Sequence, residues 1–453
     1  MKNKIFQSLL ALSLLTGITG CEKRLDIDPV NSIREEDALK TSADVEALLV
    51  GAYSDMGDAD LYGGSMYILS ELMAAGNEVA WWGTFQTYGQ VYNHNITVNN
   101  AQVANMWMSA YKVINDCNTV LANLNLVVED RRDKVEGEAK FIRGTVYFDL
   151  VRLFAKPWNQ GNPTVNDGVP IILTPTKIPL TEENKKARAK VAEVYAQVIQ
   201  DLLDAESLLG GHRKYTDFFA SSEVASAMLA RVYLQKGDYP NAAEAADKVI
   251  SSDVWTLEPT YYDDVFPYDS DNEAKVMTNT TEDVFAIQVT NTAGTNDFFT
   301  FYYYRGDITV EPAFFDLFEP DDERQYMYDG DGYIYKYTMQ YSNVHIIRLA
   351  EMYLTRAEAN FREGTAIGAE PVDDVNIIRG RVGLGGYDIA DLTLDNIILE
   401  RKLELALEGF NLQDIKRTEG AAGITSWDSP KLVFPIPDRE RKVNTLLTQN
   451  DGY

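Results

Sequence analysis

The side chains that most often carry reaction chemistry are scarce in this chain. Its 453 residues include three histidines, His94, His212 and His345, which lie far apart in sequence, and two cysteines. No glycine-rich phosphate loop, His-Glu-x-x-His pair or Gly-x-Ser-x-Gly elbow occurs. The 69 Asp and Glu residues could supply a glycosidase pair, but such a pair is defined by a spatial separation that a sequence does not give. We therefore expect no catalytic residue, no metal site and no cofactor.

Aromatic side chains offer a binding chemistry instead. Trp81, Trp82 and Tyr88 lie in a stretch without helical periodicity, and Tyr302 and Arg305 lie in a second one. Exposed rings pack on the C–H faces of sugars, while neighbouring amides, carboxylates and arginines hydrogen-bond the hydroxyl groups. The alternative is that the rings pin long loops onto the helices beneath them. We expect Trp81 and Trp82 to divide these roles, one packed and the other presented.

Cys21 is a modification site of a different kind. An apolar run at residues 5–15 follows two lysines; it is shorter than the ~20 residues that span a bilayer and is typical of a secretory signal. Gly20-Cys21 then resembles the bacterial lipoprotein box, in which the cysteine is acylated and becomes the first mature residue. The alternative is a plain signal with an incidental cysteine. We predict a signal peptide at 1–20 and a lipidated tether at 21–31, which anchor the protein to a membrane without spanning it.

Composition and charge restrict the partners. Hydrophobic residues make up 45% of the chain, enough for a substantial core, and the net charge is −28. So acidic a surface is repelled by phosphate backbones and anionic lipid headgroups. We expect no nucleic-acid partner, and neutral or cationic ligands fit the charge better.

Helical patterns dominate the segments that must position these side chains. Thr41 followed by Asp44 has capping-box spacing, and the apolar residues after it recur at helical intervals. A second long helix is expected over residues 101–126. Cys117 and Trp107 lie within it, and we interpret both as core residues.

A repeated pattern suggests how the helices are paired. A small residue, two variable residues and a tyrosine recur three times, ending at Tyr147, Tyr233 and Tyr353. The second copy continues into an alanine-rich stretch and resembles a tetratricopeptide repeat, two antiparallel helices that cross closely at small residues. The alternative is a set of unrelated amphipathic helices. Long inserts separate the copies, and loops of this length commonly bind something. Alternating tyrosines after the turn at 329–332 predict a small hairpin.

The C-terminal third carries a family resemblance. ERKLELALEG (400–409) closely resembles the Glu-Arg-x-x-Glu-Leu-Ala-x-Glu-Gly helix of SusD/RagB-type outer-membrane lipoproteins. Further motifs follow the family's order and spacing: RLAEMYL (348–354), DIKR (414–417), FPIP (434–437) and LTQNDGY (447–453). The resemblance covers essentially the whole chain. Glu400, Arg401, Glu404 and Glu408 lie at helical spacing, which favours an ion-pair network over a reactive centre.

The resemblance implies a mainly α fold: a scaffold of degenerate tetratricopeptide-like helical pairs with long ligand-binding inserts and a small β-hairpin. It implies an N-terminal region at 32–215 and a C-terminal region at 216–453. Members are lipid-anchored in the outer membrane, facing the cell exterior. They capture nutrients for a partner, a SusC-like TonB-dependent transporter, and are not enzymes.

The cargo that the resemblance implies is an oligosaccharide, with oligopeptides as the alternative. Trp81, Trp82 and Tyr88 fall in the insert where glycan platforms of the family often draw an aromatic residue, and Tyr302 and Arg305 fall in a later insert that can face the same site. Two other classes of protein are alternatives: a surface hydrolase that uses loop carboxylates, and a tetratricopeptide adaptor without a small ligand.

Overall fold

The structure is a computed structural model, and it describes residues 39–176, 182, 185–212, 214–266 and 278–453. The predicted signal peptide at 1–20 and the tether with Cys21 lie outside the described residues. Within the described parts, no helix combines the length and the apolar character that crossing a membrane requires.

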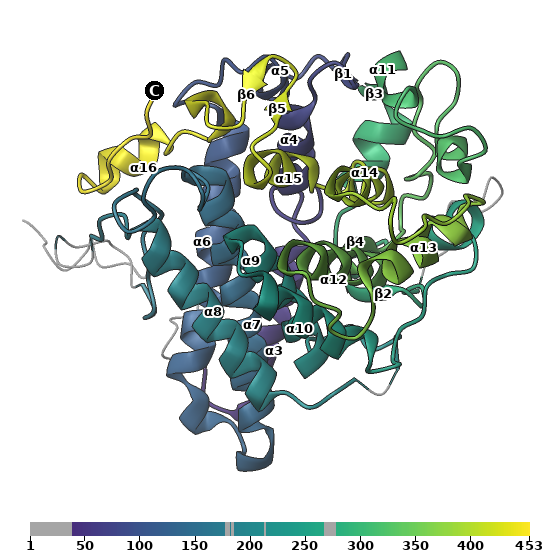
Figure 1. Cartoon of the computed structure of the whole chain (residues 1–453). Helices are drawn as coiled ribbons and strands as arrows, with labels where there is room; N and C mark the ends of the chain where they lie inside the picture. Colours follow the sequence, from purple (N-terminus) through teal and green to yellow (C-terminus); the bar gives the residue numbers. More distant parts are fainter. Residues whose placement is uncertain (1–38, 177–181, 183–184, 213, 267–277) are drawn as a thin grey trace, which may run out of the picture.

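The described chain is mainly helical, as predicted, with three short two-stranded antiparallel sheets (Figure 1). The helices are α3 (Ser42–Met56), α4 (Ser65–Ala74), α5 (Gln86–Tyr92), α6 (Ala101–Ala122), α7 (Glu129–Phe154), α8 (Val191–Leu208), α9 (Ser222–Lys236), α10 (Tyr239–Ile250), α11 (Pro312–Phe315), α12 (Leu349–Glu363), α13 (Pro371–Arg381), α14 (Leu394–Glu404), α15 (Asn411–Arg417) and α16 (Asp438–Val443). The sheets pair β1 (Val79–Trp81) with β3 (Ile308–Val310), β2 (Asp283–Ile287) with β4 (Val344–Arg348), and β5 (Ala421–Ala422) with β6 (Thr425–Ser426).

Local signals fix the helix ends. The Thr41 side chain accepts from the Asp44 backbone N–H, and the Asp44 side chain accepts from the Thr41 backbone N–H, so the predicted capping box is present at α3. Helix α6 begins where the Asn100 side chain caps it, and a short 3-10 turn continues it. Cys117 and Trp107 are buried in α6, which confirms both as core residues.

The predicted helix pair is confirmed and has two counterparts. Helices α9 and α10 pack against each other across Gly237, whose φ of 74° is the left-handed conformation that ends α9. Helices α7 and α12, which carry the other two copies of the pattern, pack in the same way against α8 and α13. A Cβ on Gly144 would lie 3.2 Å from the Asp201 Cβ, so α7 and α8 cross at a small residue. Helices α7 to α10, together with α12 and α13, therefore build the helical scaffold, most of which lies at the centre of Figure 1.

The small hairpin predicted around residues 329–332 is present in a short form. Tyr328 and Ile334 form an antiparallel bridge, and backbone hydrogen bonds join residues 327 and 329 to residues 335 and 333. The segment that follows packs on the C-terminal part of the chain. The Lys336 ammonium donates to the Ala406 carbonyl oxygen (2.8 Å), and the Tyr337 hydroxyl donates to the Leu407 carbonyl oxygen (3.0 Å). The prediction of a small hairpin is confirmed, and the buried contacts of Lys336 and Tyr337 tie its second arm to the C-terminal part of the chain.

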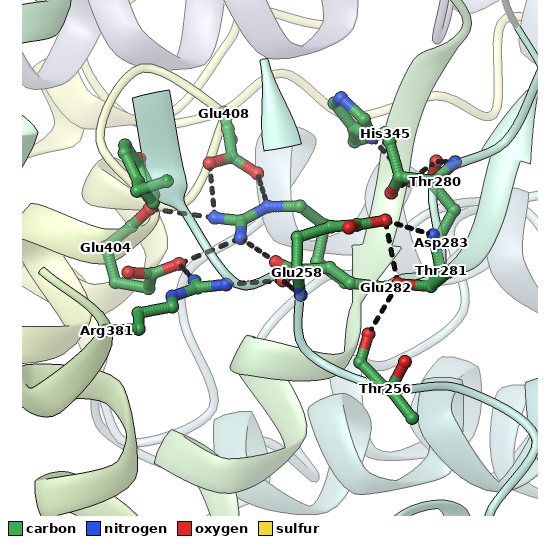
Figure 2. Close-up of polar contacts among 12 residues, drawn as sticks. Thr256, Glu258, Thr280, Thr281, Glu282, Asp283, His345, Arg381, Glu404 and Glu408 are labelled. Carbon is green, nitrogen blue, oxygen red and sulfur yellow. Dashed lines mark hydrogen bonds and ion pairs between the residues drawn. The ribbon is translucent and has the colours of Figure 1, made fainter. Parts of the chain in front are cut away.

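The predicted ion-pair network is confirmed and lies in the interior. The Arg348 guanidinium donates to Glu408 at 2.7 and 2.9 Å and to Glu404 at 2.8 Å, and it also binds Glu282. Figure 2 shows Glu282, Glu404 and Glu408 turned toward one guanidinium group, with Arg381 alongside. Opposite charges offset the cost of burying each ion. Arg348 and Lys336 accordingly hold the pKa of Glu408 at about 2 although burial acts to raise it.

Candidate functional site

The two aromatic inserts meet at the sheet of β1 and β3. Val79 is paired with Val310 and Trp81 with Ile308, and the Trp82 backbone N–H donates to the Asp307 carbonyl oxygen at 2.8 Å. Both strands are largely buried, so the pairing is anchored in the core. Segments far apart in sequence thus form one surface.

The adjacent tryptophans differ in exposure; Trp81 is the last residue of β1, and Trp82 follows it. Trp81 is half-buried, and its ring stacks on Tyr88 with centroids 5.4 Å apart and an interplanar angle of 13°. Trp82 is 69% exposed, and its indole N–H donates to the Thr309 hydroxyl at 2.9 Å, which fixes the edge of the ring. The prediction of one packed and one exposed ring is confirmed. Ligand contact by Trp82 stays a prediction.

Tyr88 lies beneath the surface as a support. It is buried in α5, its hydroxyl is 3.0 Å from that of Ser65, and its ring centroid is 4.7 Å from that of Phe301. Burial raises the pKa of Tyr88 above its usual value. With 4% of its surface exposed, Tyr88 holds Trp81 in place and has almost no face of its own to offer.

Arg305 lies at the edge of the same surface, as the resemblance implied. Its guanidinium carbon is 4.9 Å from the centroid of the Phe85 ring, a cation–π contact. Its Nε donates to Asp307 at 2.6 Å, and this hydrogen bond raises the pKa of Arg305. Phe85 is 45% exposed and was missed as a site residue, since nothing in the sequence marks which ring of a loop is uncovered. We call Trp81, Trp82, Phe85 and Arg305 the aromatic patch.

Tyr302 does not belong to this surface. Its ring is fully buried and stacks on Phe298 and Tyr337, with centroids 5.9 and 5.3 Å away. A ring without exposed surface presents no face to a ligand, so the prediction for Tyr302 is wrong. The reason is the π-helical turn η5 (Phe299–Tyr304), which turns Tyr302 inward and leaves Tyr304 76% exposed. A run of aromatic residues in the sequence does not by itself indicate such a turn.

A separate cavity of about 270 Å³ lies between α6 and the C-terminal segment, with Trp107, Tyr111 and Glu440 in its lining. It shares no residue with the aromatic patch. In the described part of the chain, no cluster of three or more His, Cys, Asp and Glu side chains is arranged to hold a metal ion. The geometry of the patch is that of a binding surface: rings, a guanidinium and a hydroxyl held on short strands.

The fold and the patch define a class: a helical tetratricopeptide-like scaffold that displays a binding surface on long inserts. Two family models match the chain. The one described as starch-binding and associating with the outer membrane matches residues 25–234, and the SusD family model matches residues 214–432. The chain belongs to the SusD/RagB family, whose members are outer-membrane-associated nutrient-binding proteins.

Individual relatives match this chain over different shares of its length. SusD-like protein P2 of Formosa agariphila is 27% identical over 97% of this chain and 98% of its own length. The starch-binding protein SusD of Bacteroides thetaiotaomicron is 32% identical, but over 25% of this chain. The crystal structure of a putative sugar binding protein from Bacteroides vulgatus superposes with a TM-score of 0.79 at 26% identity, covering 92% of this chain and 99% of that one.

Proposed function

We propose that this protein is a surface lipoprotein of the outer membrane, anchored through Cys21, that captures oligosaccharides and delivers them to a SusC-like TonB-dependent transporter. The observation that carries the proposal is the pairing of β1 with β3: it joins the exposed Trp82 to Asp307, whose partner Arg305 lies over the exposed ring of Phe85. Membership of a family of nutrient-binding proteins supports the proposal.

The patch suits a sugar chemically. The face of a pyranose ring carries C–H groups that pack on an aromatic ring, and its rim carries hydroxyl groups that need hydrogen bonds. Trp82 offers a fixed, exposed ring, and Arg305, which is paired with the neighbouring Asp307, offers N–H donors. Rings held by the scaffold lose little conformational freedom when a ligand binds.

Named relatives support a carbohydrate as the cargo. The starch-binding protein SusD matches this chain over 125 residues, and a protein described as sugar binding shares its fold at 26% identity. The patch geometry and these relatives both support a carbohydrate as the proposed ligand.

Titration calorimetry tests the proposal. Residues 22–453 are titrated with plant, host and microbial oligosaccharides and with a mixed peptide pool. Saturable heat from one glycan class that is lost in Trp82→Ala supports capture at the patch. Heat from peptides alone would move the protein to the import of oligopeptides, and steep salt dependence would accompany that result because the chain is acidic. Release of products from any glycan would instead indicate a hydrolase.

Delivery to a transporter needs a separate experiment. The lipidated protein is purified from its native membrane in mild detergent, and the associated proteins are identified. A stoichiometric outer-membrane transporter is expected. Recovery of many soluble proteins and no transporter would favour the adaptor function.

A further inference from the structure

The aromatic patch carries charge as well as rings. The Arg305 Nε donates to Asp307 Oδ2 at 2.6 Å, and its Nη2 lies 3.5 Å from Asp307 Oδ1. Nη1 of Arg305 forms no hydrogen bond with any residue that the structure describes, and 36% of the side chain is exposed. One carboxylate therefore balances the Arg305 charge, while part of the guanidinium faces solvent.

Asp307 is built into the patch. Its backbone oxygen accepts from Trp82, and it is 8% exposed. A Cβ on Gly83 would lie 2.9 Å from the Asp307 carboxyl carbon, so the carboxylate occupies space that a residue with a side chain at position 83 would take. The Arg305 guanidinium is held in turn over Phe85. The ion pair is a fixed part of the surface and not a chance contact of two mobile side chains.

Other carboxylates lie close to residues that support the rings. Glu311 accepts from the Thr309 hydroxyl (3.5 Å), which itself holds Trp82. Below the patch, burial raises the pKa of Asp297 to about 6. Burial likewise raises the pKa of Tyr88, and the charges of Asp297 and Asp60 raise it further. With Arg305 already paired to Asp307, Glu311 adds a negative charge beside Thr309, the residue that holds Trp82.

We propose that the patch selects uncharged glycans over glycans bearing carboxylate or sulfate groups, and that Asp307 sets this selectivity by pairing with Arg305. The inference rests on the proposed function. An arginine recognises an anion through two parallel N–H donors. Asp307 occupies two nitrogens of that guanidinium, and the remaining Nη1 is a donor for a hydroxyl oxygen. An anionic sugar has to displace Asp307 or lie unpaired among carboxylates, and both cost free energy.

The test uses matched oligosaccharides of equal length and the full chain purified in detergent. The pairs are oligogalactoside with oligogalacturonide, oligomannoside with oligomannuronide, and oligoglucoside with oligoglucuronide. Titration calorimetry gives, for each pair, the dissociation constant of the acidic member divided by that of the neutral member; this quotient is called the ratio below. The unaltered protein is expected to bind the neutral member at least about tenfold more tightly, since like charges oppose binding of the acid.

Two substitutions shift this ratio in opposite directions. Asp307→Asn keeps the shape of the side chain and frees the guanidinium, so the uronate binds more tightly and the ratio narrows at least about fivefold. Arg305→Gln leaves Asp307 as an unpaired acid, so the ratio widens. Asp388→Asn removes one negative charge from an exposed loop position and is expected to leave the ratio unchanged. Raising the salt concentration from about 20 mM to about 0.5 M narrows the ratio in the unaltered protein.

Equal affinity for neutral and acidic members, or an unchanged ratio in folded Asp307→Asn, overturns the selectivity and leaves glycan capture standing. If circular dichroism shows that Asp307→Asn is unfolded, Arg305→Gln and the salt series test the selectivity instead. A ratio of dissociation constants that changes in neither experiment overturns the inference. Absence of heat from every member of every pair overturns the proposed function and the selectivity with it.

Discussion

Replacement of Trp82 by alanine separates ligand binding from folding better than any other change in the patch. The ring is 69% exposed, and its one hydrogen bond goes to the Thr309 hydroxyl. Truncating an exposed side chain of this kind changes the free energy of unfolding by no more than about 0.5 kcal/mol. The variant should therefore fold normally, and any loss of affinity reports on contact with the ligand.

The size of the loss follows from the exposed area. A tryptophan side chain has roughly 250 Å² of surface, and 69% exposure leaves about 170 Å² free. A pyranose ring on one face covers about half of that area, which at ~25 cal/mol per Å² contributes about 2 kcal/mol. The dissociation constant should rise about 30-fold, because each 1.4 kcal/mol is a factor of about ten. Trp82→Phe keeps a smaller ring and should lose less.

Titration calorimetry with the best-binding oligosaccharide measures this loss, and chemical denaturation verifies that the variant is folded. Ile389→Ala is the matched control, since Ile389 is also 69% exposed but lies in a different loop. An affinity of folded Trp82→Ala within twofold of the unaltered protein would refute the placement of the site. A similar loss in Ile389→Ala would show that the effect is not specific to the patch.

Three further predictions concern the interior. Tyr302→Phe removes a buried hydroxyl without a hydrogen-bond partner among the described residues, so denaturation should show unchanged or higher stability, and titration an unchanged glycan affinity. Arg231→Met leaves the buried Glu351 carboxylate without its two 2.7 Å hydrogen bonds and should lower the free energy of unfolding by about 3–5 kcal/mol. A smaller loss of unfolding free energy in Arg231→Met/Glu351→Met would verify that the unpaired carboxylate is the cause. Burial lowers the pKa of Lys416 from 10.5 to about 7, so between these pH values the unfolded chain holds a proton that the folded chain lacks, and stability rises with pH. Lys416→Met should abolish that rise and stabilise the protein at neutral pH by about 1–4 kcal/mol, which denaturation at a series of pH values would measure.

Local signals allowed much of the scaffold to be predicted. The Thr41–Asp44 capping box and the pair α9–α10 depend on residues close together in sequence, and such patterns survive folding because nearby groups satisfy them. The partners of α7 and α12 were not predicted, since the pattern covers one helix of each pair and packing supplies the other. That one of Trp81 and Trp82 is packed and the other exposed was predicted only from their being neighbours in the sequence.

The remaining parts of the site depended on long-range contacts. Pairing of β1 with β3 joins segments that no local pattern connects, and it brings Asp307 and Thr309 to Trp82. Tyr302 was predicted at the surface because it lies in a run of rings, but the π-helical turn decides which of those rings face the core. The short hairpin was predictable from its turn residues, but the buried partners of Lys336 in the C-terminal segment were not.

The family motif and the aromatic patch are physically connected through α14. That helix ends at the motif residue Glu404, which binds Arg348 in the buried network and so fixes the helix in the scaffold. On the same helix, the Lys402 ammonium binds the Glu78 carboxylate at 2.6 Å, directly before β1. The Glu78 backbone oxygen in turn accepts from the Glu311 N–H, directly after β3. A rigid charged core can therefore hold two short strands in place, and the rings displayed on them can vary without disturbing that core.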